Sequence, residues 1–148
     1  MLNMRLSAKI EYAAIAVLEL AQHWNSDEPV RIRTICAAHG VPAGFLVQIL
    51  LQLKGAGVVT STRGAAGGYQ LARSPAEITL DDVFRAIEGP DELITAITAA
   101  RAAQSRSVSV LLDAWKEVAA NETDSLRAVT FADLVERSRV TSNPMYYI

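Results

Sequence analysis

Cysteine, histidine and long apolar runs are all scarce in this sequence of 148 residues. The single cysteine, Cys36, excludes an internal disulfide and favours a reducing cytoplasm as the compartment. Cys36 precedes His39 by about one helical turn, but the pair lacks the further ligands that a metal site requires. We therefore interpret Cys36 as a small core residue, with a redox-active thiol as the alternative.

Membrane segments, leader sequences and enzyme motifs are also missing. No apolar stretch comes close to the roughly 18 residues that cross a bilayer, and no signal-peptide cleavage pattern follows the N-terminus. There is no Gly-rich phosphate loop ending in Lys-Ser/Thr, no HExxH motif and no evident nucleophile–base pair. Two histidines and one cysteine leave few groups from which to build a catalytic site. We expect a cytoplasmic protein that is not an enzyme.

Acidic residues are absent from a window that runs from Pro29 to Ala76. The window contains five of the 14 basic residues, whereas all 16 acidic residues lie outside it. The chain therefore contains a basic segment although its net charge is −2. For nucleic-acid binding, the distribution of charge along the chain matters more than the net charge. A plain explanation is a Gly/Ala-rich core and loop region. The explanation that we favour is a surface that approaches phosphate groups and excludes carboxylates.

Hydrophobic periodicity predicts a mainly α-helical chain with one small β-hairpin. Helices are predicted over residues 7–24, 33–39, 43–56, 79–88, 107–121 and from 130 to about 139. A short strand is predicted at 30–32, and two β-prone runs, 58–63 and 69–73, flank a loop with three glycines in five residues. Glycines at this density permit a close approach of the backbone to a neighbour.

Residues with strong capping preferences mark the ends of these helices. The predicted N-terminal caps are Ser7, the pair Thr79 and Asp82, and the pair Thr130 and Asp133. Gly40 suits the left-handed conformation that ends a helix, and Pro42 suits the first turn of the next one. The resulting order of helix, strand, helix, tight turn, helix and Gly-rich hairpin is that of a winged helix-turn-helix domain.

In a winged helix-turn-helix domain, the second helix of the pair lies in the DNA major groove. Here that helix is 43–56, where Gln48 and Gln52 can pair with adenine and Phe45 can contact a thymine methyl. Arg63, beside Gly64 at the hairpin tip, can enter a minor groove. The alternatives are solvated amides for the two glutamines, a core position for Phe45 and an exposed turn position for Arg63.

The most specific motif in the chain is the hairpin segment 63–72, Arg-Gly-Ala-Ala-Gly-Gly-Tyr-Gln-Leu-Ala. With this motif the chain resembles the IscR/NsrR/CymR family of bacterial winged-helix regulators. The other matching segments are 4–7, 12–13, 40–42, 45–50, 53–59, 78–83, 86–89 and 130–134. The resemblance implies a regulator of transcription, and we expect a repressor. The alternative is a protein-interaction module on the same fold, which binds a metabolic enzyme and contacts DNA only weakly.

The resemblance also implies a homodimer that binds a palindromic operator in double-stranded DNA. The long amphipathic helix, here 107–121, is expected to cross its counterpart in the partner. The predicted dimer contacts are Val108, Leu111, Leu112, Trp115 and Val118.

By family position, Gly44 begins the reading helix and the hairpin is the minor-groove wing. The full set of predicted DNA-binding residues is Arg33, Gly44, Phe45, Gln48, Gln52, Lys54, Arg63, Gly64 and Tyr69. Arg33 and Lys54 are ordinary solvated charges unless phosphate lies nearby. A small-molecule or protein effector of unknown identity is a further partner that the resemblance allows.

Cluster-binding members of this family carry three cysteines in the region that corresponds to residues 90–106, and this chain has none there. Because thiolates are the usual ligands of iron–sulfur clusters, we predict no cluster and no other cofactor. Glu11 matches an acidic ligand position of the nitric-oxide-sensing branch. Without the cysteines, we interpret Glu11 as a carboxylate on the helix surface.

These observations divide the chain into four parts. They are a winged helix-turn-helix domain at 4–89, a linker or sensing segment at 90–106, dimerisation helices at 107–139 and a tail at 140–148. The fold class is therefore predicted to be mainly α, with a small β-hairpin wing and a long C-terminal dimerisation helix.

Overall fold

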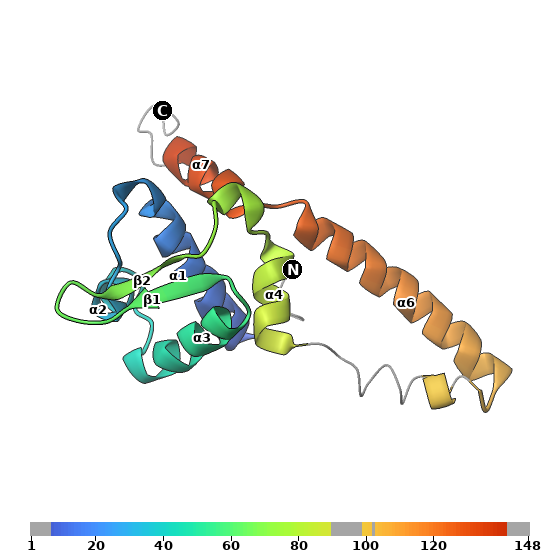
Figure 1. The fold of residues 1–148 in the computed structure, drawn as a ribbon. Helices are drawn as coiled ribbons and strands as arrows, with labels where there is room; N and C mark the ends of the chain where they lie inside the picture. Colours follow the sequence, from blue (N-terminus) through green and yellow to red (C-terminus); the bar gives the residue numbers. More distant parts are fainter. Residues whose placement is uncertain (1–6, 90–98, 102, 142–148) are drawn as a thin grey trace.

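The computed structural model describes residues 7–89, 99–101 and 103–141, and Figure 1 shows a helical body from which one long helix projects. The α-helices are α1 (Ala8–Gln22), α2 (Ile32–His39), α3 (Ala43–Gly55), α4 (Leu80–Glu88), α6 (Arg106–Arg127) and α7 (Phe131–Thr141). Two short 3-10 helices are η1 (Trp24–Ser26) and η2 (Pro75–Glu77), and the strands are β1 (Val59–Thr62) and β2 (Gly68–Leu71). The mainly helical fold with a small hairpin is confirmed.

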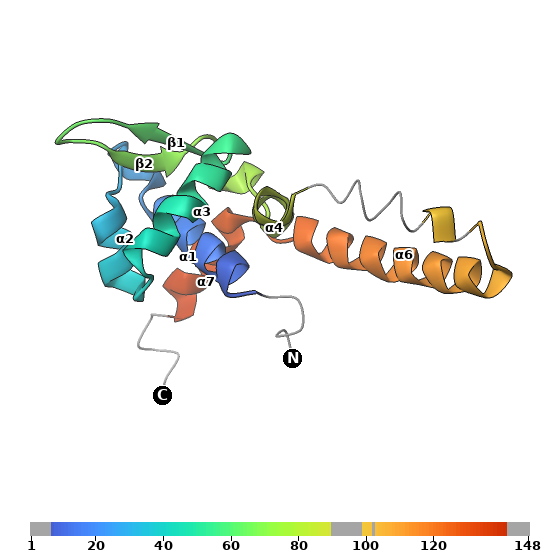
Figure 2. The ribbon, with the colours of Figure 1, turned by 90° about the horizontal axis from the view of Figure 1, so that it is seen from below.

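Helix α1 lies at the centre of the body, and α2, α3, α4 and α7 pack against it (Figure 2). The apolar residues of α1 recur at three- and four-residue steps, so one face of the helix is buried. The opposing stripe of α3 is fully buried and consists of Leu46, Ile49, Leu50 and Leu53. Burial of a leucine or isoleucine side chain contributes roughly 1.5–3 kcal/mol, so this contact fixes α3 firmly on α1.

The predicted caps form at three helix N-termini. The Ser7 hydroxyl accepts a hydrogen bond from the Ile10 N–H at 3.2 Å. Thr79 and Asp82 form a reciprocal capping box, with N–H to side-chain oxygen distances of 2.9 and 3.2 Å. The sequence thus predicted the starts of α1 and α4 to within one residue, because a cap depends on neighbours only three positions away.

Thr130 and Asp133 cap α7 in the same reciprocal way, with both distances at 3.1 Å. The Thr130 N–H and hydroxyl that donate to the Asp133 carboxylate lower the pKa of this group below its ordinary value. Helix α7 therefore starts directly after Thr130. A β-bridge between Thr79 and Thr130 places the two capped segments side by side.

The turn between α2 and α3 differs slightly from the prediction. Gly40 ends α2 with a φ of 67°, the left-handed conformation expected there. Pro42 lies at the N-cap of α3, with φ −61° and ψ 131°, and not in the first turn. Its ψ is extended, but its carbonyl already accepts from the Leu46 N–H at 3.0 Å.

The predicted strand at 30–32 is reduced to one bridge. Val30 and Tyr69 exchange two backbone hydrogen bonds of 2.8 Å, and this pairing attaches β2 to the segment before α2. Ile32 already belongs to α2, so the helix cuts the strand short.

The C-terminal part consists of two helices, α6 and α7, with different surroundings. Helix α6 continues to Arg127, beyond the predicted end at residue 121, and none of its residues is buried. Helix α7 then returns to the body, where Phe131 is 0% exposed within the same core as α1. The domain division predicted from the sequence grouped α7 with α6 as dimerisation helices and did not anticipate its packing on the body. Residues 90–98 and 142–148, which include most of the predicted linker and tail, lie outside the described residues.

Candidate nucleic-acid interface

Helix α3 carries a buried stripe on one side and an exposed face on the other. At 100° per residue, the direction opposite the buried stripe is occupied by Gly44, Gln48 and Leu51. All three are exposed, and no other described element covers them. This outward face, together with the following hairpin, is the geometry that a major-groove reading helix requires.

The two glutamines predicted to read bases are placed differently. Gln48 is exposed on the outward face of α3. Gln52 is half-buried, and its Oε1 atom is buried without a hydrogen-bond partner among the described residues. Gln48 is therefore the better placed of the two for a base edge.

Phe45 is half exposed and also packs on the body. Its ring contacts Tyr12 of α1 edge to face, with centroids 5.5 Å apart and planes at 82°. Such a pair holds both rings in place. The structure thus combines the two alternatives for Phe45, since one edge is packed and the rest of the ring faces solvent.

The hairpin between Val59 and Leu71, here called the wing, pairs β1 with β2 in antiparallel register. Arg63 and Gly64 are exposed at its tip, and Gly64 has a φ of 103°. The Arg31 guanidinium donates to the Ala65 carbonyl, so a residue that precedes α2 supports the loop. The wing therefore exposes Arg63 on a loop that the hydrogen bond from Arg31 helps to hold in place.

The wing glycines bring the backbone close to the chain itself. A Cβ at Gly67 would lie 2.2 Å from the Thr62 carbonyl oxygen, and one at Gly68 would lie 2.5 Å from the Val30 carbonyl oxygen. The close approach that the glycine density predicted is thus to β1 and to the segment before α2.

The remaining predicted DNA-binding residues lie on α2, on α3 and in the wing. The Lys54 ammonium donates to the Ser61 hydroxyl at 2.6 Å and links the end of α3 to the wing. Arg33 and Gly44 are exposed on α2 and α3. Tyr69 is half-buried, and its side chain packs against the core.

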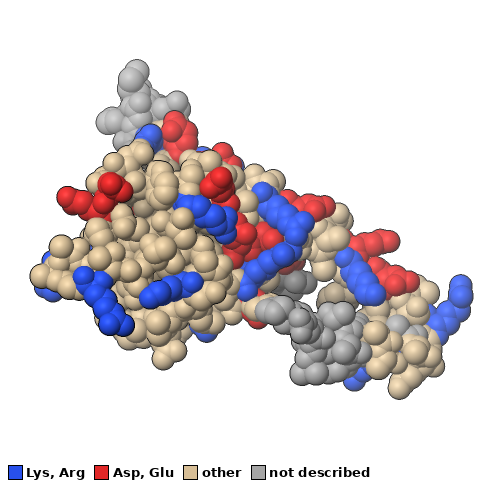
Figure 3. Space-filling model, in the orientation of Figure 1, with Lys and Arg blue, Asp and Glu red and all other residues tan. Residues whose placement is uncertain are grey.

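Charge separates on the surface as the sequence suggested. In Figure 3 the lower left of the body, over the wing and α3, shows basic side chains and no acidic ones. Arg73 is the member of the basic window that is neutralised, because it lies 3.7 Å from the Asp82 carboxylate and donates to the Glu77 carbonyl. The other side chains of the acid-free window thus leave a basic face around α3.

Sequence reasoning missed a buried carboxylate, Glu19 on α1. It is 7% exposed, and its two carboxylate oxygens lie 2.7 Å from His39 Nε2 and 3.0 Å from His23 Nδ1. The bond to His39 ties α1 to the end of α2. The i, i+4 spacing of Glu19 and His23 was the one sequence signal for this pair. The second partner of Glu19, His39 on α2, is 20 residues away, so nothing in the sequence indicated that contact.

We expect Glu19→Ala to lower the free energy of unfolding by about 1–3 kcal/mol, because both histidines lose a buried acceptor. Urea denaturation followed by circular dichroism measures this loss. Glu117→Ala, at an exposed position of α6, is the control and is expected to stay within about 0.5 kcal/mol. An equal loss for the two variants would contradict the structural importance of Glu19.

A second missed carboxylate, Asp81, connects the long helix to the body. It is 5% exposed and lies 2.9 Å from Arg85 and 3.3 Å from Arg127, near the end of α6. The contact joins residues that are 46 positions apart. Asp81 thus helps to set the direction in which α6 leaves the helical body.

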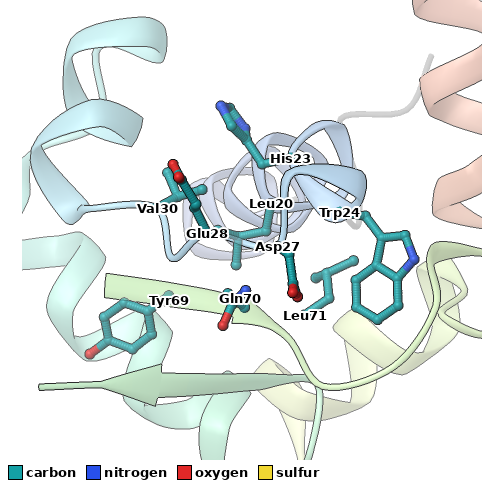
Figure 4. Close-up of a pocket in the computed structure, with 9 residues that line it drawn as sticks. All are labelled: Leu20, His23, Trp24, Asp27, Glu28, Val30, Tyr69, Gln70 and Leu71. Atoms are coloured by element: carbon teal, nitrogen blue, oxygen red, sulfur yellow. The ribbon is translucent and has the colours of Figure 1, made fainter. Parts of the chain in front are cut away.

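A small cavity of about 70 Å³ lies between the end of α1 and β2 (Figure 4). It is lined by Leu20, His23, Trp24, Asp27, Glu28, Val30, Tyr69, Gln70 and Leu71. Pockets for small-molecule ligands usually measure about 300–1,000 Å³, so this cavity does not support an effector site. The expected effector stays a prediction.

A helix-turn-helix pair followed by a two-stranded wing defines the class of winged helix-turn-helix proteins. Residues 6–137 match the model of the Rrf2 family, described as an iron-dependent transcriptional regulator. The chain belongs to this family, as the wing motif predicted.

Individual relatives agree with this assignment. A Mycobacterium tuberculosis protein named as an HTH-type transcriptional regulator is 39% identical over 131 residues, which cover 88% of this chain and 81% of that protein. The solved structure of T. potens IscR has a TM-score of 0.75 and 30% identity, and covers 99% of this chain and 98% of its own. Bacillus subtilis CymR has a TM-score of 0.64 and 31% identity, with coverages of 90% and 98%. The chain is accordingly a DNA-binding regulator of transcription, and its family is not one of enzymes.

The family description names iron, but the donors in this chain do not fit an iron–sulfur cluster. The one thiol of the sequence, Cys36, lies half-buried on α2. Across the described residues, no group of three or more His, Cys, Asp or Glu side chains is arranged to hold a metal ion. Thiolates are the usual ligands of such clusters, and a single thiol does not supply the set that a cluster requires. None of the described helices has the length and apolar character needed to cross a bilayer.

Proposed function

We propose that this regulator is a homodimeric repressor that binds a palindromic operator. The observation that carries the proposal is the apolar stripe of α6, which no other described element buries. The helix has 22 residues, about 33 Å of length, and none of them is buried. Its stripe consists of Val108, Leu111, Leu112, Trp115 and Val118, which span about three helical turns. Leu111, Trp115 and Val118 are exposed and the other two are half-buried, and this apolar surface favours association with another helix.

A second copy of the chain is the occupant that fits this stripe best. Two identical stripes can pack on each other about a two-fold axis, because each residue then meets its own equivalent or a neighbour. The same axis would place two reading helices on one face of the DNA, which requires a palindromic site. Repression then needs only occupancy of an operator that overlaps a promoter.

Binding to DNA from the chain's own upstream region tests this proposal. We expect affinity, measured by fluorescence anisotropy, to fall by orders of magnitude between 50 and 200 mM salt, because phosphate contacts release counterions. Arg63→Ala is expected to weaken binding and reduce the salt slope by about 1. Arg101→Ala is the control, because this exposed arginine belongs to the short segment 99–101, which lies at the far end of α6 from the wing (Figure 1).

Gln48→Ala is expected to cost about 1–3 kcal/mol of discrimination at one base pair per half-site. A panel of single base-pair variants of the bound fragment measures this, and Gln22→Ala, exposed on α1, serves as the control. An affinity for the DNA fragment that changed neither with salt concentration nor with Arg63→Ala or Gln48→Ala would favour the protein-interaction module instead.

A further inference from the structure

The outward face of α3 is poor in hydrogen-bonding groups. The exposed residues of this helix are Ala43, Gly44, Phe45, Val47, Gln48, Leu51, Lys54 and Gly55. Lys54 is engaged by Ser61, so Gln48 is the one exposed side chain of α3 that is left to pair with a base edge. One amide cannot specify a half-site of several base pairs by hydrogen bonds alone.

Two aliphatic side chains occupy the rest of this face. Val47 and Leu51 are 41% and 58% exposed, and their spacing of four residues places them one above the other on the helix. Neither belongs to the buried stripe of α3, so packing in the core does not explain why these two positions are apolar. They flank Gln48, and the small residues Gly44 and Gly55 leave room around them, since a Cβ at either glycine would meet nothing within 4 Å.

We propose that Val47 and Leu51 read the C5 methyl groups of thymines in the major groove. The inference rests on the proposed DNA-reading role of α3. The major-groove edge carries hydrogen-bonding groups at every base pair, and the thymine methyl is its apolar feature. Aliphatic side chains pressed against the polar groups would desolvate them without compensation, whereas contact with a methyl group removes apolar surface from water on both sides.

The spacing of the two side chains adds a positional requirement. Four residues of α-helix advance about 6 Å, and base pairs are stacked about 3.4 Å apart. A helix that lies along the groove therefore contacts methyl groups about two base-pair steps apart. The preferred half-site contains two such thymines, with the base pair read by Gln48 close to them.

Deoxyuridine tests the idea, because it lacks only the methyl group of thymidine and pairs identically. The wild-type chain first selects its preferred duplex from a random-sequence pool. Each thymidine of one half-site is then replaced in turn. At the contacted positions we expect wild-type affinity to fall about fourfold per methyl, which corresponds to the roughly 0.8 kcal/mol of one buried CH₂ group.

Substitutions in α3 identify the side chain that contacts each thymine methyl group. Leu51→Ala and Val47→Ala are expected to bind the thymidine duplex more weakly and each to lose sensitivity to deoxyuridine at one position. Gln48→Ala is expected to keep that sensitivity. Val110→Ala on α6 is the matched control, because Val110 is 59% exposed and lies on the side of α6 away from the dimer stripe. Thermal unfolding checks that each variant is folded.

The outcomes separate this inference from the proposed function. Failure of the wild type to select any sequence would overturn both. Selection of a clear site whose affinity ignores every deoxyuridine would overturn methyl reading alone. An unchanged deoxyuridine effect in both Val47→Ala and Leu51→Ala would assign the methyl contact to another residue and likewise refute the proposal.

Discussion

Trp115→Glu is expected to convert the proposed dimer into a monomer and to weaken DNA binding by about 10²–10⁴-fold. Trp115 lies at the middle of the α6 stripe and is 61% exposed in the single chain. Central tryptophans at interfaces commonly contribute at least about 2 kcal/mol, and a carboxylate on each helix at a two-fold contact adds desolvation and repulsion. The loss on DNA follows because two linked reading helices bind far more tightly than one.

Sedimentation velocity measures the mass of the variant, and fluorescence anisotropy measures its operator affinity. Val110→Glu is the matched control, because it introduces the same charge at nearly the same exposure, 59%, on another side of α6. It is expected to leave both quantities unchanged. A dimeric Trp115→Glu, or equal effects of the two variants, would contradict the proposed interface.

Gly67→Ala is expected to open the wing and to lower operator affinity at least about tenfold. The added Cβ would lie 2.2 Å from the Thr62 carbonyl oxygen and 2.9 Å from the Gly64 carbonyl oxygen. All of the nearby atoms belong to the backbone, so no flexible side chain can move aside. Relief requires separation of the turn from β1, and overpacking of this kind costs about 1–3 kcal/mol.

Hydrogen exchange checks this prediction locally. The amide of Val30, which pairs with Tyr69 of β2, is expected to lose protection in the variant. Glu117→Ala, at an exposed position of α6 outside the apolar stripe, is the control and is expected to keep both the Val30 protection and the DNA affinity. Retention of the Val30 protection and of DNA affinity in Gly67→Ala would show that the wing tolerates the side chain.

Much of the exposed face formed by α3 and the wing was predictable from local patterns. The apolar stripe of α3 follows from spacing at three and four residues, and Gly40 marks the end of α2 through its tolerance of a positive φ. Placing Gln48 and Arg63 at exposed positions required only the helix period and the location of the turn. Their contact with DNA stays a prediction.

Other features depend on residues that the sequence gives no reason to pair. Glu19 looks like a surface residue, yet it is buried because α2 brings His39 against α1. Gln52 has the spacing of an outward residue, but the packing around α3 buries its Oε1. Phe131 lies far along the chain from α1, and nothing in its local pattern indicates that it completes the same core.

The sequence by itself determined the scarcity of cysteine, the acid-free basic window, the helical and hairpin elements and the caps, because each depends on composition or on neighbours within one or two turns. Tertiary structure alone decided that α7 returns to the body, that Asp81 joins α4 to α6 and that Gly68 lies against the backbone of Val30. These contacts join distant positions, and only the packing of whole elements determines which distant side chains meet.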